Sequence, residues 1–155
     1  MQPPTIGHQL VIDKILELSK DCDNILFLSQ THNNKTDPLD WEFKSEICKN
    51  AWKTINISDD KNIKNPYQAL EKLSIEYDEI TMVVGSDRKE EFEKMNDYLK
   101  DNIKFDVISV GNRNIFNGIN GISGTKMRNY VLENNKELFL KRLPTGLNKK
   151  LRNKT

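Results

Sequence analysis

Apolar residues recur along this chain in two spacings, which predict helices alternating with strands. Val11, Ile15 and Leu18 follow one another at helical intervals and predict an amphipathic helix over residues 7–20. The same spacing predicts further helices over residues 41–52, 67–77, 88–100, 125–134 and 136–140. In the helix predicted over residues 67–77, Leu70, Leu73 and Ile75 are the expected core positions.

Short, unbroken apolar runs separate these helices. The run 25–29 is typical of a strand buried on both faces, the runs 79–84 and 105–110 predict two further strands, and residues 54–57 predict one more short strand. Strands that alternate with helices predict an α/β fold with a parallel sheet and right-handed crossovers. We expect one domain over residues 1–140, followed by a basic tail over residues 141–155.

Length and composition narrow the class of protein. The chain has 155 residues, the usual size of one domain, and its net charge of +1 gives no overall attraction to nucleic acid or membranes. No apolar run approaches the roughly 20 residues that span a bilayer. The first residues lack the features of a signal peptide. Two cysteines without a CxxC motif indicate a reducing compartment, so we expect a soluble, cytoplasmic protein.

The charge is uneven near the end of the chain, where six cations follow Glu137 without any acid. They are Lys141, Arg142, Lys149, Lys150, Arg152 and Lys154. Two interpretations stay open at this point. The segment is a frayed, solvated terminus, or it makes a weak contact with phosphate or nucleic acid.

A first candidate motif, Thr5-Ile6-Gly7-His8, opens the first predicted helix. Gly7 lets the backbone approach a phosphate closely, and the helix N-terminus supplies N–H groups and a positive dipole end. His8 is then placed to donate to a phosphoryl oxygen. The alternative is a histidine with a purely structural role.

A second motif, Gly85-Ser86-Asp87-Arg88, follows a predicted buried strand. Gly85 permits a tight turn, Asp87 could bind a ribose or base, and Arg88 could hold a phosphate through two hydrogen bonds. The alternative is an ordinary turn from strand to helix with Asp87 as the capping residue.

A third motif, Ser123-Gly124-Thr125-Lys126-Met127-Arg128, opens a late helix. Lys126 and Arg128 bring positive charge to a helix N-terminus, where it opposes the helix dipole. An anionic ligand would explain that arrangement. The alternative is a capped helix with incidental cations.

Taken in this order, the three motifs resemble those of the HxGH nucleotidyltransferases, over residues 2–140. Thr5 stands where many members have the first His. Gln2-Pro3 and the third motif are similar to the nicotinamide-mononucleotide adenylyltransferase group, and residues 29–41 resemble compact phage versions. Family members begin with a strand before the first motif, which this sequence lacks, so we expect an N-terminally truncated chain.

The resemblance implies a Rossmann-like three-layer sandwich. It also implies transfer of a nucleoside monophosphate, AMP rather than CMP, from a nucleoside triphosphate to a small phosphorylated acceptor, with release of pyrophosphate. The implied catalytic residues are Thr5, His8, Lys35 and Arg128. The implied nucleotide-binding residues are Gly7, Gly85, Asp87, Arg88, Ser123, Gly124 and Thr125. Mg²⁺ would bind through substrate phosphates and not through a protein cage, and members often form homo-oligomers.

In an open parallel sheet, ligands bind in the crevice outside the carboxyl ends of the strands. Lys44 could also face this crevice, whereas His32 lacks the spacing of a metal ligand. Three other functions remain open. One is a cytidylyltransferase that acts on an alcohol phosphate, and another is a fragment similar to class I aminoacyl-tRNA synthetases. The third is a non-catalytic relative that binds nucleotides or RNA.

Overall fold

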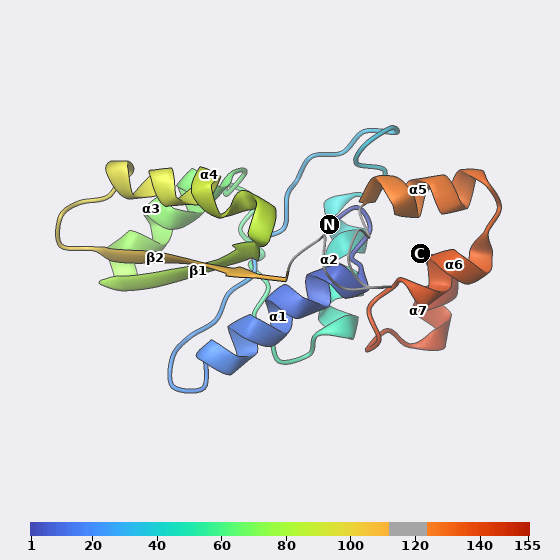
Figure 1. Cartoon of the computed structure of the whole chain (residues 1–155), viewed down its shortest axis with the longest axis horizontal. Coiled ribbons are helices and arrows are strands. Elements are labelled where there is room, and N and C mark those ends of the chain that lie inside the picture. The colour runs from blue at the N-terminus through green and yellow to red at the C-terminus, as the bar shows by residue number, and fades with distance from the viewer. Residues whose placement is uncertain (112–123) are drawn as a thin grey trace.

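The computed structural model describes residues 1–111 and 124–155, with residue 124 by its backbone alone. The elements are α1 (Ile6–Leu18), α2 (Trp41–Ala51), α3 (Pro66–Glu76), β1 (Glu79–Gly85), η1 (Ser86–Arg88), α4 (Lys89–Glu93), η2 (Lys94–Tyr98), β2 (Lys104–Val110), α5 (Gly124–Leu132), α6 (Lys136–Lys141) and α7 (Lys149–Lys154). They form a mixed α/β fold, consistent with a Rossmann-like arrangement. The strands with α3 and α4 lie at one end, α5 to α7 lie at the other, and α1 and α2 lie between them (Figure 1).

The sheet consists of β1 and β2, which pair in parallel along their whole length, from Glu79 opposite Lys104 to Gly85 opposite Val110. Alternate residues of both strands, including Ile80 and Phe105, are buried on one face. They pack there against side chains of α3, α4 and η2. Both strands were predicted, and the structure confirms them as parallel.

The predicted strands 25–29 and 54–57 are wrong as strands. Within the described residues they meet only at one parallel bridge, between Leu26 and Ile57. Leu26 accepts a hydrogen bond from Ser58 and donates one to Asn56, but a strand needs such pairing along several residues. Ile25 is 39% exposed, so this run is not buried on both faces.

The single helix predicted over residues 88–100 is also wrong, because the chain forms η1, α4 and η2 in succession. Phe92 and Met95 are both buried against the sheet. They lie three residues apart, and a helix with three residues per turn brings such positions onto one side. Ile75 of α3, expected in the core, is 82% exposed.

The C-terminal segment 141–155 is not a frayed end. Leu143, Leu147 and Leu151 are buried and pack with Ile47 of α2 and Met127 of α5 in one cluster. The backbone N–H of Ile6 donates to the carbonyl oxygen of Arg142 at 2.9 Å. The segment therefore covers α2 and α5 and also holds the first turn of α1.

Candidate active site

The first motif is built around a contact between Thr5 and His8. Thr5 is fully buried and stands just before α1 in extended backbone conformation, with φ −131°. Its backbone N–H donates to Nδ1 of His8 at 3.0 Å, and its Oγ1 lies 2.9 Å from the same nitrogen. A backbone N–H can only donate, so Nδ1 must accept. The neutral ring therefore carries its proton on Nε2.

This geometry is compatible with both interpretations of His8, the structural one and the chemical one. The ring folds back on the residue before the helix, as the third-position side chain of a capping box does. The Nδ1 side of the ring thereby supports the start of α1. The other nitrogen, Nε2, carries the proton and is a donor. His8 itself is half-buried.

Arg128 connects the third motif to the start of the chain. Its Nη1 donates to the carbonyl oxygens of Gln2 at 3.2 Å and Thr36 at 2.9 Å, and its Nη2 donates to Oγ1 of Thr125 at 3.1 Å. Gln2 and Arg128 are 126 positions apart in the sequence. The fold thus brings α5 beside the segment that leads into Thr5 and His8.

The guanidinium of Arg128 retains donors for an anion. A guanidinium has five N–H groups, and its contacts within the described residues use three of them. The N–H of Nε and the second N–H of Nη2 have no partner among the described residues, and guanidinium N–H groups donate well to phosphate oxygens.

Gln2 fixes the other wall of this region. Its side chain is buried, donates through Nε2 to the carbonyl oxygen of Leu39 at 3.1 Å, and accepts from the Leu39 N–H at 3.0 Å. The pair of hydrogen bonds fastens the chain start to the segment just before α2. The Gln-Pro resemblance singled out this residue, but its structural use could not be read from the sequence.

The loop between Leu28 and α2 is shaped by Asn33, which the sequence did not single out. Its Oδ1 accepts from the backbone N–H groups of Lys35 and Thr36 at 3.0 and 2.8 Å, and its Nδ2 donates to the carboxylate of Asp37 at 2.9 Å. Lys35 is exposed on this turn. Because Thr36 also contacts Arg128, Lys35 is held on a loop that adjoins the third motif.

Lys44 does not face an open crevice, because only 1% of it is exposed. Its Nζ donates to the carbonyl oxygen of Ser29 and lies 3.2 Å from Ser29 Oγ. Burial lowers the pKa of the Lys44 ammonium, and the nearby Asp37 partly offsets that effect. Lys44 thus ties α2 to the point where the Lys35 loop begins.

The second motif lies where both parallel strands end. A Cβ on Gly85 would lie 3.0 Å from Oδ1 of Asp87, so the glycine leaves room for that carboxylate to fold back. Arg88 donates to both carboxylate oxygens of Glu91, at 3.2 and 3.1 Å, and stacks on the Phe92 ring at 4.8 Å. Its phosphate-binding role stays a prediction, since these contacts match an ordinary turn.

Arg88 nevertheless lies close enough to the start of the chain to act on it electrostatically. Burial lowers the pKa of the Met1 α-amine, and the positive charges of Lys44 and Arg88 lower it further. Cys48 and Asp37 shift the pKa of the same amine in the opposite direction, and the effect of Arg88 is the smallest of these.

The third motif is described only in part. Ser123 lies outside the described residues, and Gly124 begins α5. Thr125 is exposed and accepts from Arg128, while Met127 is fully buried in the cluster with α2 and α7. The burial of Met127 fixes which face of α5 carries Arg128.

Neither a metal centre nor a bilayer-spanning helix is present in the part of the chain that the structure describes. No group of three His, Cys, Asp or Glu side chains there could hold a metal ion. No helix within residues 1–111 and 124–155 has the length and apolar character to cross a bilayer.

Comparison with known proteins gives one informative similarity. The chain is 27% identical over 119 residues to a probable nicotinate-nucleotide adenylyltransferase of Acholeplasma laidlawii (strain PG-8A). The match covers 71% of this chain and 63% of the relative. The similarity supports the resemblance to nucleotidyltransferases. No family model matches the chain, and no solved structure does so.

Proposed function

We propose that this protein is a nucleotidyltransferase that transfers a nucleoside monophosphate to a phosphorylated acceptor. The observation that carries the proposal is the pairing of Thr5 with Nδ1 of His8, which leaves the ring proton on Nε2. Arg128, with two N–H groups left for an anion, adjoins the same segment through its bond to Gln2.

The chemistry needs positioning and charge stabilisation more than proton transfer. An oxygen of the acceptor phosphate, already ionised near neutral pH, forms a bond to the α-phosphorus of the triphosphate. The bond from that phosphorus to the bridging oxygen breaks, and pyrophosphate leaves with the electron pair. His8 donates from Nε2 to an α-phosphate oxygen as negative charge develops.

The remaining residues take binding roles in this proposal. Arg128, Thr125 and Ser123 hold the β- and γ-phosphates, and Lys35 holds the acceptor phosphate. Asp87 and Arg88 lie beside the nucleoside, while Gly7, Gly85 and Gly124 allow close approach of the backbone.

Mg²⁺ fits this site only as an ion carried by the substrate. The described residues offer no cluster of carboxylates or histidines for it, so its ligands would be triphosphate oxygens and water. When bound it would neutralise charge on the phosphates. The protein groups that act on the same phosphates are His8 and Arg128.

The finer identity of the substrates rests on the relative and on Gln2-Pro3. We propose ATP as the donor over CTP, and a pyridine mononucleotide as the acceptor, because the similar protein is named a probable nicotinate-nucleotide adenylyltransferase. We further propose a homo-oligomeric protein of the cytoplasm.

The decisive experiment measures pyrophosphate release for ATP and CTP, each with nicotinate mononucleotide, nicotinamide mononucleotide, phosphopantetheine or glycerol 3-phosphate. We expect release with ATP and a pyridine mononucleotide. Release with CTP and glycerol 3-phosphate would assign the cytidylyltransferase alternative. Exchange of pyrophosphate into ATP that depends on an amino acid would assign the synthetase alternative. Nucleotide binding without turnover by any pair would overturn the enzymatic proposal.

Substitution of Lys35 tests separately whether this residue binds the acceptor phosphate. Lys35→Met should raise the KM for the acceptor about tenfold or more while changing the KM for ATP little, because a charge-assisted contact to one phosphate contributes about 1.5–3 kcal/mol. Lys20→Met, at an exposed lysine just beyond the C-terminal end of α1, is the matched control. An unchanged acceptor KM would remove Lys35 from the site.

A further inference from the structure

A groove lies between α2 and α7. It has a volume of about 710 Å³ and contains none of the residues assigned to nucleotidyl transfer. Its lining includes Trp41, Ser45, Lys49, Lys53, Lys150 and Lys154. The proposal made below for this groove therefore does not depend on the proposed function.

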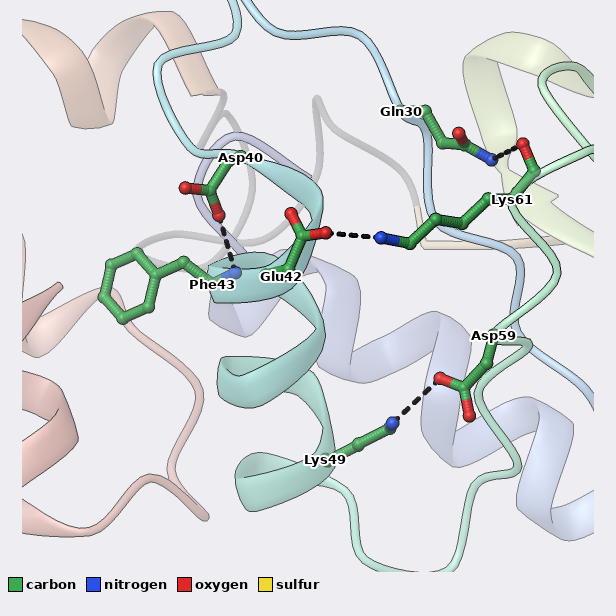
Figure 2. A network of polar contacts seen from close by, with 7 residues as sticks. All are labelled: Gln30, Asp40, Glu42, Phe43, Lys49, Asp59 and Lys61. Atoms are coloured by element: carbon green, nitrogen blue, oxygen red, sulfur yellow. Dashed lines mark hydrogen bonds and ion pairs between the residues drawn. The ribbon is translucent and has the colours of Figure 1, made fainter.

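Both walls of this α2–α7 groove are held in place. Figure 2 shows Glu42 and Lys49 reaching from α2 to the neighbouring segment, where they pair with Lys61 at 2.5 Å and Asp59 at 2.9 Å. On the other wall, the backbone N–H of Asn148 donates to Oδ1 of Asn50 at 3.0 Å. The groove is thus a fixed feature of the fold.

The groove carries excess positive charge. Lys49 pairs with Asp59 and Lys154 lies 3.7 Å from Glu46, whereas Lys53 and Lys150 have no carboxylate partner among the described residues. Glu42 and Glu46 also line the groove, but each is paired with a lysine. An anionic ligand would therefore meet two uncompensated cations and no uncompensated acid.

Ser45 adds an observation that points to a ligand. The residue is 3% exposed, and its Oγ has no hydrogen-bond partner within the described residues. A buried hydroxyl without a partner destabilises the fold, so native proteins rarely leave one unsatisfied. Because Ser45 lines the groove, an oxygen of a bound ligand could accept from it.

The aromatic ring of Trp41 indicates the class of ligand. It is half-buried, lines the same groove as the lysines and has the Lys61 ammonium 5.3 Å from its ring centroid, so a base would lie against the part of the ring that Lys61 does not cover. Lysines that track phosphates, together with an aromatic ring on which a base can stack, are the two elements of single-strand recognition. We propose that the α2–α7 groove binds single-stranded nucleic acid, with Lys53 and Lys150 on phosphates, Ser45 donating to a phosphate oxygen and a base against Trp41.

The test measures fluorescence anisotropy of a labelled 12-nucleotide oligouridine with the full chain, from 50 to 200 mM salt. The double variant Lys53→Gln/Lys150→Gln should bind about 25-fold more weakly at 0.1 M salt, because each phosphate contact to a single strand contributes about 0.7 to the salt slope. The magnitude of the slope of log K against log salt concentration should fall by about 1.4. Lys20→Gln/Lys100→Gln removes two exposed lysines elsewhere and should bind like the wild type.

Ser45→Ala separates a ligand contact from a packing role. It should weaken oligouridine binding while leaving the thermal midpoint unchanged or higher, because the removed hydroxyl has no partner in the fold.

Three results of the binding measurements would overturn the proposal. These are no binding at 50 mM salt, equal affinity of the double variant and its control, and equally tight binding of polyglutamate, which would assign an acidic protein partner. Pyrophosphate release should be unchanged in the double variant. Joint loss of release and of oligouridine binding would assign both lysines to nucleotidyl transfer and would also overturn it.

Discussion

The backbone N–H of Thr5 and Nδ1 of His8 form a 3.0 Å hydrogen bond that sets the tautomer of the neutral histidine ring. One nitrogen accepts from the residue before α1, so the proton of the neutral ring lies on the other nitrogen. A structural bond within four residues thereby prepares a donor at the helix N-terminus, where anions bind favourably.

Two substitutions of His8 separate these roles. His8→Asn places an oxygen near the position of Nδ1 and keeps the acceptor for Thr5, so stability should change by less than about 0.5 kcal/mol. Transfer should fall about 10²–10³-fold, because the donor on Nε2 is lost. His8→Ala should show the same fall in the transfer rate, and its free energy of unfolding should also fall by about 1 kcal/mol. Pyrophosphate release and urea unfolding measure the two effects, and full turnover by His8→Asn would remove the ring from the chemistry.

Arg128 should affect folding and substrate binding together. Arg128→Met removes the donors to Gln2, Thr36 and Thr125, so we expect a loss of about 1–3 kcal/mol in the free energy of unfolding. Arg128→Lys keeps the charge but cannot reach three acceptors and a phosphate at once. It should therefore keep part of the stability and raise the KM for the triphosphate. Wild-type values of both quantities in Arg128→Lys would contradict the bridging role.

Lys44→Met should destabilise the protein by about 1–3 kcal/mol at pH 7, because it removes the charge-assisted hydrogen bond that joins α2 to Ser29. Lys49→Met, on the exposed face of the same helix, is the control. Urea unfolding at pH 7 measures both variants.

The effect of Lys44 should also depend on pH. Burial lowers the folded-state pKa of its ammonium, so the unfolded state binds more protons between that pKa and the ordinary lysine value. Stability of the wild type relative to Lys44→Met should therefore rise with pH through the alkaline range below the ordinary lysine pKa of about 10.4. A difference that falls as pH rises would contradict the burial of the charged group.

Gly146 permits the close approach of the C-terminal segment to α2. A Cβ at this position would lie 2.2 Å from the backbone carbonyl oxygen of Ala51, so Gly146→Ala must displace one of the two segments. We expect a loss of about 1–3 kcal/mol in urea unfolding, as for other overpacked contacts. Thr145→Ala, one residue earlier and exposed, should be nearly neutral. Equal stability of the two variants would show that the segment is not held against α2.

Local pattern was sufficient for much of the fold. The spacing of Val11, Ile15 and Leu18 predicts α1, because a helix that buries one face needs apolar residues every three to four positions. The short apolar runs after residues 78 and 104 predict β1 and β2. The run 25–29 failed as a strand, since pairing depends on a neighbour that no local pattern specifies. The sequence did not exclude a frayed basic tail, because Pro144 and Gly146 interrupt the four-residue spacing of its three buried leucines.

The sequence by itself determined which residues could carry the chemistry: a glycine and a histidine at one helix start, and cations at another. Only the tertiary structure decided how they are used. Arg128 meets Gln2 across 126 positions, and Lys44 is buried against Ser29. The physical reason is that residue type and spacing fix local hydrogen bonding and amphipathicity, whereas burial, donor occupancy and pKa depend on neighbours that only folding brings together.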